Sequence, residues 1–154
     1  AAAAPGAGAA TGGGGEPLQG PLRSSIQSGF KAMGLSLGSS IVMETVTYPD
    51  GDTYAGTLRN GKRHGHGEYQ DSTNGYHYTG DWAEDARDGR GTLASPDGAF
   101  CYDGEWRRDA RTGEGSLILR GVLTYTGAFL DGEFHGPGSC VYSEGVVYEG
   151  EFRR

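Results

Sequence analysis

The chain has 154 residues, of which 35% are hydrophobic and 30 are glycine, and its net charge is −7. A chain of this length builds one modest core, so neither several domains nor a large cavity is expected. The acidic balance opposes binding to duplex nucleic acid, which normally requires a basic face. The two cysteines, Cys101 and Cys140, are too few for a disulfide framework.

Two different segments precede the aromatic part of the chain. Residues 1–21 are almost wholly alanine, glycine and proline, which predicts a disordered tail. Residues 22–43 predict a linker or a short amphipathic helix, because glycines interrupt a helical spacing of apolar residues. This stretch is also too short and too polar to span a membrane. The apolar positions are Leu22, Ile26, Phe30, Met33, Leu37 and Ile41.

From residue 44 onward the sequence repeats with a period of 24 or 23 residues. The repeat is marked by a tyrosine at Tyr54, Tyr78, Tyr102, Tyr125 and Tyr148. Two residues later comes a glycine, at Gly56, Gly80, Gly104, Gly127 and Gly150. Four residues after the tyrosine comes a large apolar side chain, at Leu58, Trp82, Trp106, Phe129 and Phe152. The first four repeats then continue with a Gly-x-Gly pair, at Gly65 and Gly67, Gly89 and Gly91, Gly113 and Gly115, and Gly136 and Gly138.

The even offsets predict β-hairpins, because alternate side chains of a strand share one face. Tyrosine, glycine and the bulky residue belong to a first strand, and the Gly-x-Gly pair begins a second one after a turn. Glycine weakens a strand unless another group approaches the backbone closely, and we expect the ring of a neighbouring hairpin to do so. The second strand adds Tyr69, Leu93, Leu117 or Cys140 to the apolar face, whereas Cys101 is predicted to point away.

These residues resemble the MORN (membrane occupation and recognition nexus) repeat family, whose pattern is Tyr-x-Gly-x-aromatic, a turn, then Gly-x-Gly and a second strand. The resemblance covers residues 44–154, as a half repeat, four full repeats and a truncated fifth. It implies an all-β fold, an elongated single-layer antiparallel array of stacked β-hairpins. Asp85 and Asp109 stand where Gly61 and Gly132 occupy the first turn, which predicts altered turns in those two repeats.

Residues 57–70, TLRNGKRHGHGEYQ, are the stretch most suggestive of a reactive site. They lack the Gly-x4-Gly-Lys-Ser/Thr order of a phosphate loop, and other repeats lack the histidines, so we interpret Lys62, Arg63 and His64 as turn residues. His64 and His66 could share a face, but no third ligand is indicated, so no metal site is predicted.

No catalytic residue or cofactor site is predicted, and we do not expect an enzyme. Carboxylates such as Glu84, Asp85 and Asp88 lie beside arginines, which is typical of a solvated, partly paired surface.

The repeat residues can serve either for packing between repeats or as a groove for a partner helix or extended segment. They are Tyr54, Gly56, Tyr78, Gly80, Trp82, Tyr102, Gly104, Trp106, Tyr125, Gly127, Phe129, Tyr148, Gly150 and Phe152. Contact with anionic lipid headgroups would use Lys62, Arg63, Arg107 and Arg108. The open strands at the ends of the array need a cover, from residues 22–43, a continuation of the chain or another subunit.

The sequence therefore predicts a non-enzymatic scaffold that docks protein subunits of a larger assembly. The resemblance implies a ciliary or cytoskeletal setting in the cytoplasm. One alternative is a phosphoinositide-binding membrane-contact module. Another is a peripheral subunit inside an organelle after removal of a transit peptide, which the alanine-rich start allows. No cofactor, nucleic acid or transmembrane segment is expected.

Overall fold

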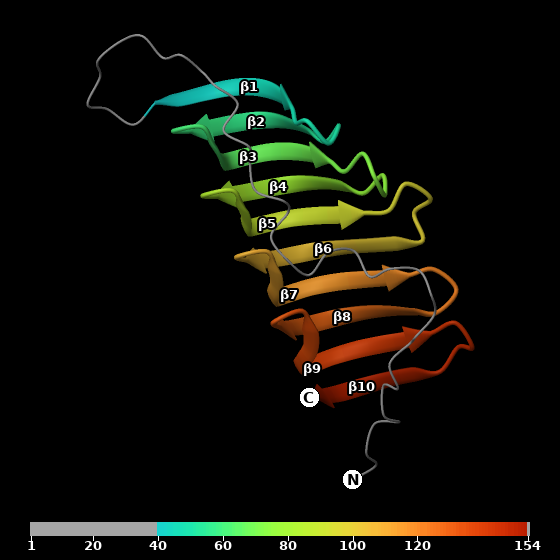
Figure 1. Cartoon of the computed structure of the whole chain (residues 1–154). Coiled ribbons are helices and arrows are strands. Elements are labelled where there is room, and N and C mark those ends of the chain that lie inside the picture. Colours follow the sequence, from blue (N-terminus) through green and yellow to red (C-terminus); the bar gives the residue numbers. More distant parts are fainter. Residues whose placement is uncertain (1–39, 154) are drawn as a thin grey trace.

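The structure is a computed structural model that describes residues 40–153. These residues form one open sheet of ten antiparallel strands, in which each strand pairs with its neighbours in sequence (Figure 1). The predicted all-β, single-layer array is thereby confirmed. The strands are β1 (Ile41–Thr47), β2 (Thr53–Arg59), β3 (Lys62–Gln70), β4 (His77–Ala83), β5 (Ala86–Ala94), β6 (Phe100–Arg107), β7 (Ala110–Leu119), β8 (Leu123–Leu130), β9 (Glu133–Tyr142) and β10 (Val147–Phe152).

The first strand begins inside the segment for which a linker or helix was expected. Residues 41–43 belong to β1, where Val42 pairs with Leu58 and Val46 pairs with Tyr54 of β2. At the strand period of two, Val42 and Val46 share a face, so Ile41 does not continue a helical stripe. The predicted tail of residues 1–21, and the predicted linker or helix up to residue 39, lie outside the described residues.

Two-residue turns close the hairpins β2–β3, β4–β5, β6–β7 and β8–β9 along one side of the sheet, here called the tight-turn edge (Figure 1). Both residues of every turn have positive φ, as a type I′ hairpin turn requires. The φ values of Asp85 and Asp109 are 71° and 68°, close to the 78° of Gly61 and 87° of Gly132. The expectation of altered turns was wrong. The turn begins one residue before Gly61, so Lys62, Arg63 and His64 lie on β3 and not in the turn.

The repeat tyrosines and their cross-strand partners form a continuous row on one side of the sheet, here called the inner face. Register places Tyr54 opposite Tyr69, Tyr69 opposite Tyr78, and Tyr125 opposite Cys140. Tyr69, Cys140 and their counterparts on β5 and β7 are buried, as predicted. Cys101 is half-buried and points to the opposite side, here called the outer face, also as predicted.

Each repeat tyrosine lies flat across the two glycines of its own hairpin. A Cβ added at Gly104 would lie 2.5 Å from the Tyr102 hydroxyl oxygen, and one added at Gly115 would lie 2.7 Å from it. The same hydroxyl donates a hydrogen bond of 2.8 Å to the carbonyl of Glu105. The glycines are thus needed for close approach, as expected, but the ring comes from the same hairpin and not from a neighbouring one.

The bulky residue of each repeat joins consecutive hairpins. The Trp106 ring meets Tyr102 of its own repeat edge-to-face, with ring centroids 5.1 Å apart, and meets Tyr78 of the preceding repeat at 5.6 Å. Its indole nitrogen also donates a 2.9 Å hydrogen bond to the Gly91 carbonyl. Equivalent contacts link nine rings into one chain: Tyr54, Trp82, Tyr78, Trp106, Tyr102, Phe129, Tyr125, Phe152 and Tyr148.

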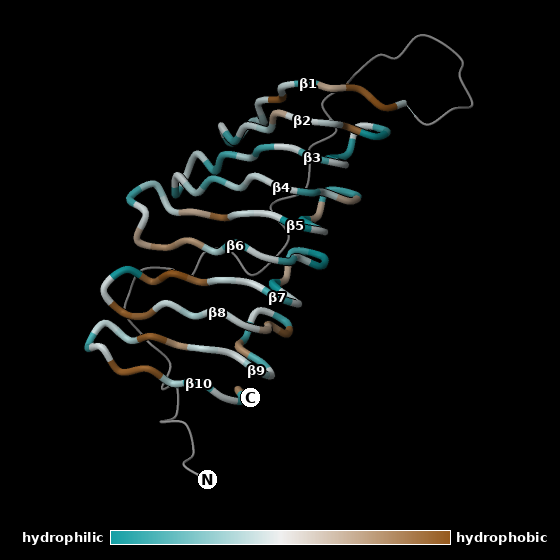
Figure 2. The backbone as a smooth tube through the Cα atoms, turned by 180° about the vertical axis from the view of Figure 1, so that it is seen from behind, coloured by the Kyte–Doolittle hydropathy of each residue, from teal (hydrophilic) through white to brown (hydrophobic). Residues whose placement is uncertain are grey.

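A β-bulge in each hairpin lies beside the bulky residue. The register shifts between Gly80 and Trp82 on β4, and the first glycine of the facing pair, Gly89, has a φ of 114°. Bulges increase local twist and bend the strand that carries them. The hairpins accordingly bend at the tight-turn edge, as seen from behind in Figure 2.

We expect Trp106→Ala to lower the free energy of unfolding by about 3 to 5 kcal/mol, because it removes a buried ring that joins two repeats. The neighbouring Arg107→Ala is the matched control, since Arg107 is exposed and its change should stay within about 0.5 kcal/mol. Urea unfolding followed by circular dichroism measures both. Equal midpoints for Trp106→Ala and the unaltered chain would contradict the packing role of the ring.

Candidate docking surfaces

The aromatic inner face is occupied by its own packing. Tyr54, Tyr78, Tyr102 and Tyr125 are all 0% exposed, and Trp106 is 4% exposed. The structure brings the predicted repeat residues together in one face, but it leaves most of their rings unavailable to a partner. The exceptions lie on β10, where Tyr148 and Phe152 are half-buried and Gly150 is exposed.

The buried hydroxyl and thiol groups of this face are held in their protonated forms. Burial raises the pKa of Tyr54 and of Tyr125 to about 12, and it raises the pKa of Cys140 above that of an ordinary thiol. A thiol or phenol that keeps its proton near neutral pH is a poor nucleophile. These groups therefore act as packing and hydrogen-bonding groups.

Sequence reasoning missed a set of buried arginines on the inner face. Arg87 is 0% exposed, and its guanidinium carbon lies 4.1 Å from the centre of the Trp106 ring. The Asp109 carboxylate, which comes from the turn of the next repeat, accepts hydrogen bonds from Arg87 Nε at 2.9 Å and from the Arg87 backbone N–H at 3.0 Å. Burial lowers the pKa of Arg87, and contact with Asp109 opposes that shift. Arg63, Asp85 and Trp82 repeat this arrangement one hairpin earlier.

The arginine arrangement, here called the Arg–Asp clamp, changes toward the C-terminus. Arg111 donates a 2.8 Å hydrogen bond to the backbone carbonyl of Gly132, because no turn carboxylate occupies that position. In the fourth repeat Phe134 replaces the arginine and stacks on Tyr125, with ring centroids 3.8 Å apart and planes 10° apart. Ionic contacts thus add to the ring contacts between the first repeats, and the stacked Phe134 ring takes their place in the last full repeat.

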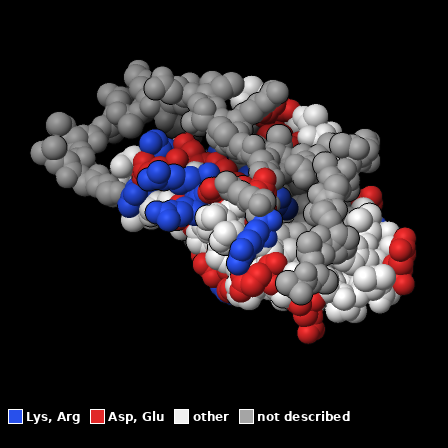
Figure 3. All heavy atoms as spheres, turned by 90° about the horizontal axis from the view of Figure 1, so that it is seen from below, with Lys and Arg blue, Asp and Glu red and all other residues white. Residues whose placement is uncertain are grey.

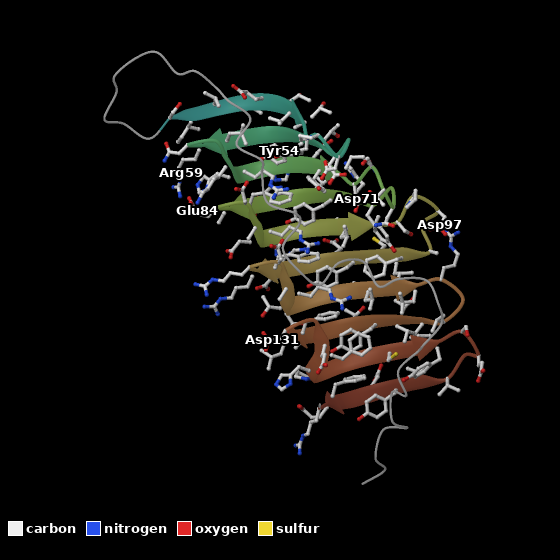
Figure 4. All side chains as sticks on the ribbon, viewed as in Figure 1. Tyr54, Arg59, Asp71, Glu84, Asp97 and Asp131 are labelled. Carbon is white, nitrogen blue, oxygen red and sulfur yellow. The ribbon has the colours of Figure 1, made fainter. Side chains whose placement is uncertain are left out.

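Only some of the cations considered for lipid contact are accessible. Arg63 is 1% exposed, so its assignment as a lipid-contact residue was wrong: its side chain lies under Trp82 and not in a surface turn. Lys62 is exposed but forms a 2.9 Å ion pair with Glu84, which also binds Arg59 at 2.7 Å. These contacts lower the pKa of the Glu84 carboxyl to about 2. Figure 4 shows Arg59 and Glu84 together at the tight-turn edge.

Arg107 and Arg108 are the remaining candidates for lipid contact. Both are exposed at the β6–β7 turn, and among residues 40–153 neither guanidinium forms an ion pair. On the face seen from below in Figure 3, Lys and Arg side chains lie beside Asp and Glu side chains. The predicted lipid set is therefore reduced to one pair of arginines.

A shallow polar hollow of about 590 Å³ lies on the outer face between the second and third hairpins. Asp81, Arg90, Glu105 and Arg107 line it, and Arg90 lies 3.9 Å from Glu105. His66 contacts Asp81 at 3.3 Å. Residues 40–153 contain no group of three or more histidine, cysteine or carboxylate side chains that could hold a metal ion.

An apolar row, here called the outer stripe, crosses the C-terminal half of the outer face. Register places Ile118 of β7 opposite Thr124 of β8, Thr124 opposite Val141 of β9, and Val141 opposite Val147 of β10. The three aliphatic side chains are 42%, 43% and 56% exposed. The same row in the N-terminal half is polar, as at Gln70. In Figure 2, where residues of both faces are coloured alike, hydrophobic segments are more frequent on β7 to β10 than on β2 to β4.

A single layer of stacked hairpins, each completed by its neighbours, defines a β-repeat protein. A family model for the MORN repeat matches residues 54–76, 78–100, 102–120 and 125–147. The chain belongs to the MORN repeat family, as the resemblance implied. MORN repeats are known for protein or membrane binding and are not a catalytic family. A search of the curated proteins found no match. No helix among the described residues is long and apolar enough to cross a membrane.

We expect Asp109→Gly to lower the free energy of unfolding by about 3 to 5 kcal/mol, because it leaves the buried Arg87 charge without its carboxylate. Glycine suits the positive φ of this turn better than aspartate does, so the turn itself cannot cause the loss. The control is Arg108→Gly in the same turn, because Arg108 also has positive φ but its side chain is exposed. Urea unfolding measures both variants, and equal midpoints would contradict the role of the clamp.

Proposed function

We propose that this chain is a non-enzymatic scaffold whose sheet docks a protein partner within a larger assembly. The outer stripe carries the proposal, because Ile118, Val141 and Val147 stay exposed in one row while the aromatic face is consumed by packing. Aligned apolar side chains on a folded surface mark an interaction site more often than single exposed ones do. A rigid strand framework also presents them with little loss of conformational entropy on binding.

The partner surface that suits the stripe is apolar at its centre and polar at its rim. Thr124 lies between Ile118 and Val141. The neighbouring row of the outer face, two residues along each strand, carries Ser116, Thr126 and Ser139. Such a row of hydroxyls beside an apolar strip resembles the polar rim around the centre of a protein interface.

The cellular setting that we propose is a cytoskeletal or ciliary assembly, supported only by the resemblance to repeat proteins that act as spacers and adaptors. The interior of an organelle is the alternative setting. The lack of enzymatic activity is part of the same proposal, supported by the protonated state of the buried tyrosines and thiols.

The experiment compares Ile118→Lys/Val141→Lys with Gln70→Lys/His77→Lys, which changes the polar end of the same row. Affinity purification with quantitative mass spectrometry identifies a stoichiometric partner of the unaltered chain, and calorimetry with purified proteins then measures binding. We expect the stripe variant to lose about 2 kcal/mol or more of binding free energy and the control to lose little. Equal affinity of both variants would overturn the outer stripe as the docking surface.

We propose phosphoinositide binding as a second candidate function, on the exposed pair Arg107 and Arg108. Each cation near an anionic membrane surface adds about 1 kcal/mol, so one pair supports weak, salt-sensitive binding. We expect sedimentation with phosphoinositide-containing vesicles at low salt, and its loss in Arg107→Ala/Arg108→Ala. Lys62→Ala is the control, because Lys62 is paired with Glu84. Binding that survives the arginine changes would reject this candidate.

A further inference from the structure

Across β6 to β10, the outward side chains form three parallel rows, here called the outer block. The first row is the outer stripe, extended on β6 by Cys101, which lies opposite Ile118. The second is the row of hydroxyls, which ends in Asp103 on β6 and in Glu149 on β10. The third row lies two residues further along each strand and consists of Glu105, Glu114, Ala128, Pro137 and Glu151.

The outer block is acidic on the side away from the stripe. Its three rows contain carboxylates but no lysine, arginine or histidine. Glu105 lies 3.9 Å from Arg90 of the adjoining strand β5. Among residues 40–153, neither Glu114 nor Glu149 forms an ion pair, and both are exposed. The block therefore combines an apolar row with carboxylates whose charge is not compensated by a neighbouring cation.

The dimensions of the outer block match those of one α-helix laid across the strands. Four strand separations from β6 to β10 extend about 19 Å, and the first and third rows lie about 13 Å apart. A helix of about 13 residues is about 20 Å long and, with its side chains, about 10 to 12 Å wide. Each helical turn advances about 5.4 Å, so apolar residues at every third or fourth position meet successive strands along the stripe.

We propose that the outer block binds an amphipathic helix of a partner protein, which rests on the docking function proposed above and specifies its partner. The apolar side of the helix covers Ile118 and Val141. Lysine or arginine side chains on its flank face Glu114 and the other carboxylates. Burial of the stripe supplies affinity, while the charges at the rim set the orientation of the helix and the salt dependence of binding.

Other occupants match the outer block less well. A second copy of the block would place carboxylates against carboxylates, or carboxylates against the apolar stripe. An anionic membrane would be repelled by the same carboxylates. Arg107, Arg108 and Arg120 lie outside the block, in or beside turns, so the phosphoinositide candidate concerns a different surface.

The test uses two labelled peptides of about 15 residues, both with leucine along one helical face. One carries lysine on the flanks of that face, and the other carries glutamate there. We expect the lysine peptide to bind the whole protein saturably in fluorescence anisotropy, and the glutamate peptide to bind at least about tenfold more weakly. In NMR spectra, the lysine peptide should shift the amides of Ser116, Thr126 and Ser139.

The carboxylates are tested by a pair of charge-matched variants. Glu114→Gln/Glu149→Gln should weaken binding of the lysine peptide at least about threefold at low salt, and less at high salt. Glu44→Gln/Glu144→Gln is the control, because it makes the same change of charge at exposed positions outside the block. The control should keep the affinity of the unaltered chain.

Equal affinity for the two peptides, or for the two charge variants, would overturn the basic helix as the partner. Loss of the captured partner in Ile118→Lys/Val141→Lys would still support the docking function in that case.

Two further results would identify a different occupant and overturn the proposal. One is dimerisation of the unaltered chain in sedimentation velocity that is lost in Ile118→Lys/Val141→Lys, which would indicate a second copy. The other is tighter binding of the lysine peptide by Phe30→Asp, which would indicate that residues 22–39, outside the described residues, compete for the block.

Discussion

The fold depends on the contact between a tyrosine ring and two facing glycines. The ring can lie flat on the backbone only where neither strand has a Cβ, as at Gly104 and Gly115 under Tyr102. The bulky residue of the following repeat then packs roughly perpendicular to the tyrosine. The ring centroids of Phe129 and Tyr102 are 5.0 Å apart. One close approach per hairpin therefore sets both the internal geometry of the unit and its fit to the next.

The same constraint determines which surfaces are left for function. A single sheet has no second layer to cover its apolar face, so the side chains of that face cover one another. Arginine takes part in this cover because its flat guanidinium stacks on a ring while its nitrogens bind the next turn, as Arg87 does with Trp106 and Asp109. Because the inner face is closed in this way, the outer face and the turns are the surfaces of the described residues that stay accessible.

The repeating phase of Tyr54, Gly56 and their counterparts was sufficient to predict the fold, the inner row and the opposite orientation of Cys101 and Cys140. The Arg–Asp clamps were missed because the strand was placed to begin after His64, which put Arg63 in a turn and made Asp85 look like a solvated carboxylate. A signal was present: Arg63 and Asp85, and Arg87 and Asp109, are both 22 residues apart. The outer stripe could not be predicted, since its row depends on strand register set by the bulges.

Phe134 stands in the fourth repeat where earlier repeats have an arginine, so the two ends of the array are stabilised by different interactions. The cost of removing charges from water falls as temperature rises, so ionic contacts hold better on warming. Stacked rings such as Phe134 on Tyr125 rely instead on apolar burial, whose contribution levels off on heating. Fraying on warming should therefore begin among the last repeats, close to the strand that carries Tyr148, while the clamped repeats near Arg63 keep their order.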